Sequence, residues 1–262
     1  MSCIYKYKGK DYTKEEFYSL VSSSNFTQQE QAKKFAELQE RLNNKEFLEG
    51  AKNAFESSEE LQQFGTQEQY NDYIARVSLG IIKNPSSGEY NYESKVKDIV
   101  YHATTSKFDK FDKSKLASTT GNYGFQGGGV YFYKKSKDAK LFIDSTFKVD
   151  SAIISSIVNI QKPFINTVEQ AEDIGYSHKS DVAIYTALGN KQKAQVFTEN
   201  LQNKGYDAVI DGEELNVLEP EQIHILGSKQ DIEGFKSYVN NKSKFLTQEK
   251  NNEVSKNFIT PE

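Results

Sequence analysis

Apolar residues recur at helical spacing through the first third of the chain, where polar residues fill the positions between them. Several helix starts are marked by capping boxes, in which a Ser or Thr precedes a Glu or Gln by three residues. The boxes are Thr13 with Glu16, Thr27 with Glu30, Ser57 with Glu60, and Thr66 with Gln69. The second predicted helix carries Phe35, Leu38, Leu42 and Phe47 on one face, and the last carries Tyr70, Tyr73, Ile74 and Val77. This part of the chain is therefore predicted to be helical.

From Lys95 onward the pattern changes to short β-rich runs. Strands are predicted at residues 96–102, 130–132, 152–160, 206–210, 215–218 and 222–226, and residues 163–165 are expected to close the third of them. Few helices lie between them: one from Ser136, as its cap, to Ile143, and one at residues 191–203 that ends before Gly205. A doubly wound parallel sheet needs a helix between most strands. We therefore predict an α+β fold with a largely antiparallel, split sheet.

Turn-forming residues at 84–88 suggest a boundary, so we expect three parts. These are a helical N-terminal module at 1–94, a sheet domain at 95–227, and a C-terminal helix with a polar tail at 228–262. The helix of the last part is predicted at residues 231–239.

Composition narrows the function classes. The net charge of −4 gives no general attraction to nucleic acid, so such a partner is not indicated. Cys3 is the only cysteine, and His102, His178 and His224 show no ligand spacing, so we expect no disulfide within the chain and no metal. We expect His178 and His224 to be structural or exposed. The sequence shows no signal pattern and no long apolar run, so we expect no membrane association and a cytoplasmic location.

Three short segments, far apart in sequence, carry the candidate chemistry. They are Tyr101-His102-Ala103-Thr104, the glycine-rich stretch from Gly127 through Tyr131 to Tyr133, and Glu213-Glu214-Leu215-Asn216-Val217-Leu218. In order and context they resemble the His-Tyr-Glu class of the ADP-ribosyltransferase fold, the class of diphtheria toxin and the poly(ADP-ribose) polymerases. The resemblance runs from about Lys95 to Leu226 and is closest to the domains of phage and mobile-element polyvalent proteins. It implies NAD as the substrate and no metal.

The resemblance also implies roles for individual residues. His102 would bind the adenosine ribose, and the backbone of Ala103, where the family usually has Gly, would hold the nicotinamide amide. Thr104 matches the usual third residue. Tyr131 would stack on the nicotinamide ring.

Two assignments stay open. Many relatives have a second aromatic residue at the position of Leu141, so Phe142 is the candidate for the other side of the ring. Glu214 would stabilise the positive charge on the nicotinamide ribose, with Glu213 as the competitor if the register slips by one. Asn216 stands where an apolar residue is usual.

The resemblance predicts cleavage of the nicotinamide–ribose bond and transfer of ADP-ribose to a macromolecular acceptor, expected to be a host protein. The alternatives are an NAD glycohydrolase and an inactive NAD-binding or structural module. The polar segment 166–190 is expected to face the acceptor. A bacterial or phage-infected cell is the expected setting, with association with the virion as an alternative location. Ser118-Thr119-Thr120 suggests the other transferase class, but neither Arg41 nor Arg76 lies on a suitable first strand.

Overall fold

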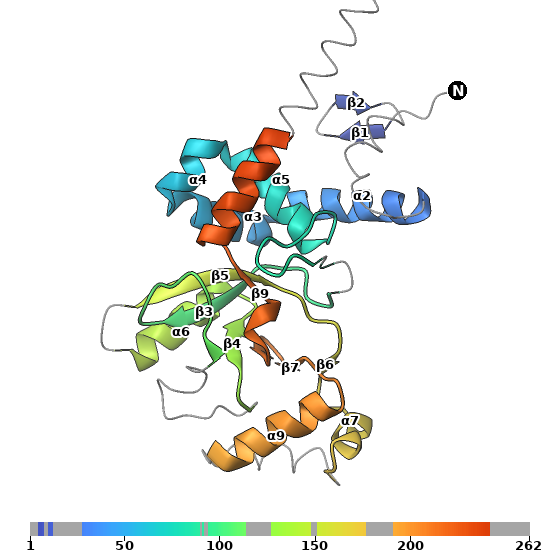
Figure 1. Ribbon diagram of the computed structural model, residues 1–262, viewed down its shortest axis with the longest axis vertical. Coiled ribbons are helices and arrows are strands. Elements are labelled where there is room, and N and C mark those ends of the chain that lie inside the picture. The colour runs from blue at the N-terminus through green and yellow to red at the C-terminus, as the bar shows by residue number, and fades with distance from the viewer. Residues whose placement is uncertain are drawn as a thin grey trace, which may run out of the picture.

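The computed structural model describes residues 5–7, 10–12, 28–89, 91, 94–113, 127–147, 151–176 and 191–241. A seven-stranded sheet forms its centre, and the N-terminal helices gather on one side of it (Figure 1). The predicted α+β fold is confirmed. A separate hairpin pairs β1 (Tyr5–Tyr7) with β2 (Lys10–Tyr12).

The described N-terminal part contains four helices, α2 (Gln28–Asn43), α3 (Lys45–Glu56), α4 (Glu59–Phe64) and α5 (Gln67–Ser78). Of these, α3, α4 and α5 begin at side-chain caps. The capping box of Thr66 and Gln69 is confirmed, but Ser58 caps α4, one residue later than predicted. Phe47 does not continue the helix of Leu38, because Asn44 ends α2 and caps α3 by accepting two backbone N–H groups. The helix start predicted at Thr13 lies outside the described residues.

The large sheet has the strand order β6-β7-β8-β4-β3-β5-β9. Every neighbouring pair is antiparallel except β6 with β7, as the sequence pattern predicted. The strands are β3 (Val100–Thr104), β4 (Val130–Tyr133), β5 (Ala152–Val158), β6 (Pro163–Phe164), β7 (Ala208–Asp211), β8 (Glu214–Val217) and β9 (Ile223–Ile225).

The first strand of this sheet begins four residues later than predicted. The Ser94 hydroxyl binds the backbone of Val96 and also accepts the N–H of Ile160. These side-chain bonds hold residues 94–96 in a turn, which competes with extension of the strand.

The remaining helices lie between the strands or follow the last one. They are α6 (Ser136–Thr146), α7 (Val168–Asp173), α9 (Lys191–Asn203), the short 3-10 helix η2 (Pro220–Gln222) and a C-terminal helix at residues 229–241. Lys135, not Ser136, precedes α6 as its cap. The helix α7 lies inside the segment 166–190 that was expected to face an acceptor, and its start is capped by Thr167. Residues 177–190 lie outside the described residues.

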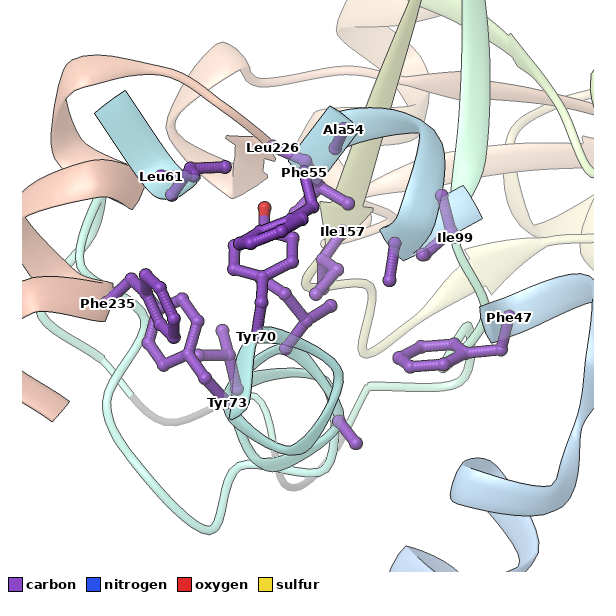
Figure 2. Packing of buried hydrophobic residues seen from close by; sticks show 14 of the residues in the cluster. Phe47, Ala54, Phe55, Leu61, Tyr70, Tyr73, Ile99, Ile157, Leu226 and Phe235 are labelled. Carbon is purple, nitrogen blue, oxygen red and sulfur yellow. The ribbon is translucent and has the colours of Figure 1, made fainter. Parts of the chain in front are cut away.

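The C-terminal helix packs against α5, not against the far side of the sheet (Figure 1). Figure 2 shows Phe235 beside Tyr70 and Tyr73, and its ring meets that of Tyr70 edge-on at 5.2 Å between centroids. Both helices thus share one core with a face of the sheet, represented by Tyr101 of β3 and Ile157 of β5. The boundaries at residues 94 and 227 stay a prediction. In the described part of the chain, no helix is long and apolar enough to cross a bilayer.

Candidate active site

The sheet opens between its two central strands, β3 and β4. Five positions of β3 pair with β5, and four positions of β4 pair with β8. Between β3 and β4 the register has one position, Tyr101 opposite Tyr133. Continued pairing would place Ala103 opposite Tyr131, so the strands part beside the residues that the sequence singled out. This gap is the split that the sequence pattern predicted.

His102 bridges the gap with its side chain. Its Nδ1 lies 2.7 Å from the carbonyl oxygen of Tyr131. Because a carbonyl can only accept, Nδ1 carries the proton, and Nε2 of the neutral ring is left as an acceptor. Burial lowers the pKa of His102, and the bond to Tyr131 opposes that shift only in part. The ring is therefore neutral at physiological pH and suited to accept a hydrogen bond from a ribose hydroxyl.

Aromatic side chains hold the His102 ring in place. Phe111 lies edge-on to it at 5.1 Å between centroids, with Phe132 at 5.7 Å and Phe108 at 6.3 Å. Phe111 and Phe132 belong to the core on one face of the sheet. The imidazole is thus fixed on this face before any ligand arrives.

Tyr131 projects from the opposite face of β4, because side chains alternate along a strand and Phe132 occupies the first face. Its hydroxyl donates to the carbonyl of Gly127 at 2.8 Å. That glycine has φ +88°, a conformation that side chains disfavour. The next N–H, of Gly128, donates to the Thr198 hydroxyl of α9 at 2.8 Å. The helix α9 therefore anchors the end of the glycine-rich loop that carries Tyr131.

Glu214 begins β8 directly opposite Tyr133, on the same face as Tyr131. Leu215 belongs to the core of the other face, which fixes this orientation by alternation. Burial and the nearby charge of Asp211 raise the pKa of Glu214. Glu213 instead forms an ion pair with Lys135 at 3.2 Å, and its side chain is 53% exposed.

The aromatic residue next to Glu214 is Tyr133, which the sequence analysis did not assign to the site. Burial and the charge of Glu214 raise the pKa of Tyr133 to about 12. The ring of Phe142 lies 5.9 Å from that of Tyr133 and 5.7 Å from that of Phe147. Leu141 is 65% exposed on α6. Side chains two residues apart on a strand lie on the same face. The position of Tyr133 two residues after Tyr131 could therefore have identified it as a site residue from the sequence.

The candidate residues therefore approach the gap from both faces of the sheet. His102 comes from one face, and Tyr131 and Glu214 come from the other. The backbone of Ala103 and Thr104 lies on β3 beside the point where the two strands part. A cavity of about 360 Å³ lies nearby, at the start of β3 and beside Glu213, but His102, Tyr131 and Glu214 are not among its described walls.

Residues 97–245 match the family described as ADP-ribosyltransferase in polyvalent proteins. The chain belongs to this family. The matched region contains the whole seven-stranded sheet and the C-terminal helix, and so all six candidate site residues. No curated protein and no solved structure matches the chain. This member of the family has a mostly antiparallel sheet in which β3 and β4 pair at a single position.

Proposed function

We propose that this ADP-ribosyltransferase uses NAD as its donor and transfers ADP-ribose to a macromolecular acceptor, with a host protein as the expected class. The observation that carries the proposal is the gap between β3 and β4, with His102 on one side and Tyr131 and Glu214 on the other. On this proposal the nicotinamide amide binds beside the unpaired part of β3, where backbone groups of Ala103 and Thr104 hold its polar edge.

Cleavage of the nicotinamide–ribose bond builds positive charge on the ribose, as in glycoside hydrolysis. Glu214 supplies a carboxylate in a partly buried setting, where its field is screened less than in water. Nicotinamide leaves as a neutral molecule, so the protein need not supply a strong acid. The acceptor then attacks the ribose carbon and loses its proton.

The other residues position the dinucleotide. The Nε2 of His102 accepts from a hydroxyl of the adenosine ribose, and the backbone of Ala103 and Thr104 holds the nicotinamide amide. Tyr131 provides a stacking surface. We assign the opposite wall to Tyr133 backed by Phe142, because the Phe142 ring packs on Tyr133.

Label transfer from tagged NAD into bacterial lysate tests this proposal, with nicotinamide release followed in the same tubes. Labelled protein bands together with release would support a transferase. Release without bands would favour a glycohydrolase. Absence of both nicotinamide release and labelled bands would contradict the proposal. That result would favour an inactive module, and NAD binding would then be measured.

A further inference from the structure

A second polar cluster lies at the β9 edge of the sheet, where this strand meets α5 and the C-terminal helix. His224 and Asp231 are completely buried there. The Nε2 of His224 lies 2.8 Å from Oδ1 of Asp231. The second carboxylate oxygen accepts the Tyr70 hydroxyl at 2.5 Å and the N–H of Gly227 at 2.7 Å. This carboxylate is therefore held rigidly against the imidazole.

An exposed serine completes the chain of hydrogen bonds. The hydroxyl of Ser86, in the turn at residues 84–88, lies 2.7 Å from Nδ1 of His224. In the tautomer whose Nε2 donates to the carboxylate of Asp231, Nδ1 of His224 can accept from the Ser86 hydroxyl. Serine, histidine and aspartate thus stand in the relation that activates a serine hydroxyl by a general base.

The backbone around Ser86 decides which reaction this arrangement can support. Attack on a carbonyl needs free N–H groups to bind the oxyanion. Here the N–H of Ser86 donates to Oδ1 of Asn84 at 2.9 Å, and that of Gly88 to the Asn84 carbonyl at 2.7 Å. Acyl transfer would therefore lack these donors. Transfer of ADP-ribose develops positive charge on the ribose, and the acceptor needs only a hydroxyl that a base can deprotonate.

We propose that Ser86 is a self-modification site that accepts ADP-ribose from the active site of a second copy of this chain; this inference rests on the proposed function. The Ser86 oxygen forms a bond to the ribose carbon while the bond to nicotinamide breaks. Nicotinamide leaves as a neutral molecule, and the serine proton passes to Nδ1 of His224, where the carboxylate of Asp231 balances the charge of the imidazolium.

Transfer occurs between copies because of the distance within one copy. His224 lies on β9 and Glu214 on β8, four strands apart in the order β9-β5-β3-β4-β8. Neighbouring strands are spaced by about 4.8 Å, which places the two strands about 19 Å apart. Ser86 therefore cannot reach the ribose carbon at Glu214 of its own chain.

Ser87 provides a matched control. It is also exposed, but its hydroxyl accepts the N–H of Glu89 at 3.2 Å and is not bonded to His224. We would use a size-tagged Glu214→Gln copy as the acceptor, with untagged wild-type protein and labelled NAD. The tagged copy should gain label, Ser86→Ala in it should abolish that label, and Ser87→Ala should not. Equal labelling of the two serine variants would overturn the inference.

Nicotinamide release separates this inference from the function on which it rests. Absence of release and of label with wild-type protein would contradict the proposed function. Normal release with label only on residues other than Ser86, mapped by mass spectrometry, would contradict the self-modification site alone.

The role of Asp231 as a positioning residue has its own readout. Asp231→Asn in the tagged copy should slow Ser86 labelling about 10²-fold near neutral pH, the order of a general-base contribution, with recovery at alkaline pH. Nicotinamide release by an Asp231→Asn enzyme should remain unchanged. An unaltered labelling rate and pH profile would show that the carboxylate has no such role. If a thermal melt shows that Asp231→Asn is unfolded at the assay temperature, the comparison of Ser86→Ala with Ser87→Ala tests the self-modification site instead.

Discussion

At the scale of single residues, the environment of Glu214 sets the pH dependence that we expect. Its pKa lies above that of an exposed glutamate because of burial and the charge of Asp211. Cleavage needs the carboxylate, so nicotinamide release should fall at a higher pH on acidification than an exposed glutamate would give. Asp211→Asn removes the like charge and lowers the pKa of Glu214, so the acid limb of the pH–rate profile should move to lower pH. An unshifted limb would contradict this assignment.

Tyr133 should contribute through its ring rather than its hydroxyl. Tyr133→Ala uncovers Glu214 to water and removes a stacking surface, so nicotinamide release should fall about 10–100-fold, as expected for loss of an aromatic contact and its shielding. Tyr133→Phe keeps the ring and should retain most activity. Steady-state kinetics on both variants, with thermal melts as folding controls, would check this. Equal losses in the two variants would point to the hydroxyl instead.

At this scale the sequence pointed to the individual residues but not to their surroundings. His102, Tyr131 and Glu214 could be picked out by motif, whereas the contact of Tyr133 with Glu214 depends on the pairing of β4 with β8. Similarly, Asn216 looked out of place in a strand, yet it is buried opposite Tyr131 beside Gly129. Pairing register depends on residues distant in sequence, and a single motif does not determine it.

At the scale of elements, Gly129 allows β4 and β8 to approach. A Cβ on Gly129 would lie 2.1 Å from Oδ1 of Asn216 and 2.6 Å from the Val217 carbonyl oxygen, whereas one on Gly128 meets only Thr198, at 3.6 Å. Gly129→Ala should therefore lower the free energy of unfolding by about 1–3 kcal/mol, the usual cost of overpacking. Gly128→Ala should cost less than half as much. Urea denaturation of both variants would measure this, and equal effects would contradict the packing argument.

The elements themselves were only partly predictable. Periodicity located most strands and helices, but several boundaries moved where a side chain bonded to the backbone, as at Asn44 and Ser94. The opening between β3 and β4 is a property of two segments about thirty residues apart in sequence. Local pattern suggested a split sheet but could not show which strands part.

At the scale of the whole molecule, the helices before and after the sheet form one core with it. Phe235 is completely buried against Tyr70 and Tyr73, although about 160 residues separate them in sequence. Phe235→Ala should destabilise the entire chain by about 3–5 kcal/mol, as truncation of a buried aromatic does. The exposed Glu233→Ala on the same helix should change the free energy of unfolding by less than about 0.5 kcal/mol.

If hydrogen exchange of Phe235→Ala showed lost amide protection in the C-terminal helix alone, with protection of the sheet unchanged, the result would contradict a shared core. The sequence predicted this helix but not its partner, because an amphipathic pattern does not specify what it packs on.

The most direct test of the central claim is the rate of nicotinamide release by Glu214→Gln beside Glu213→Gln. The two glutamates are adjacent, but only Glu214 shares a face with Tyr131, and Glu213 is paired with Lys135 near solvent. We predict that Glu214→Gln loses about 10²-fold or more in kcat with KM little changed, as when charge stabilisation in the transition state is removed. Glu213→Gln should keep nearly wild-type activity. Full activity in Glu214→Gln, or a loss confined to Glu213→Gln, would contradict the assignment of the active site.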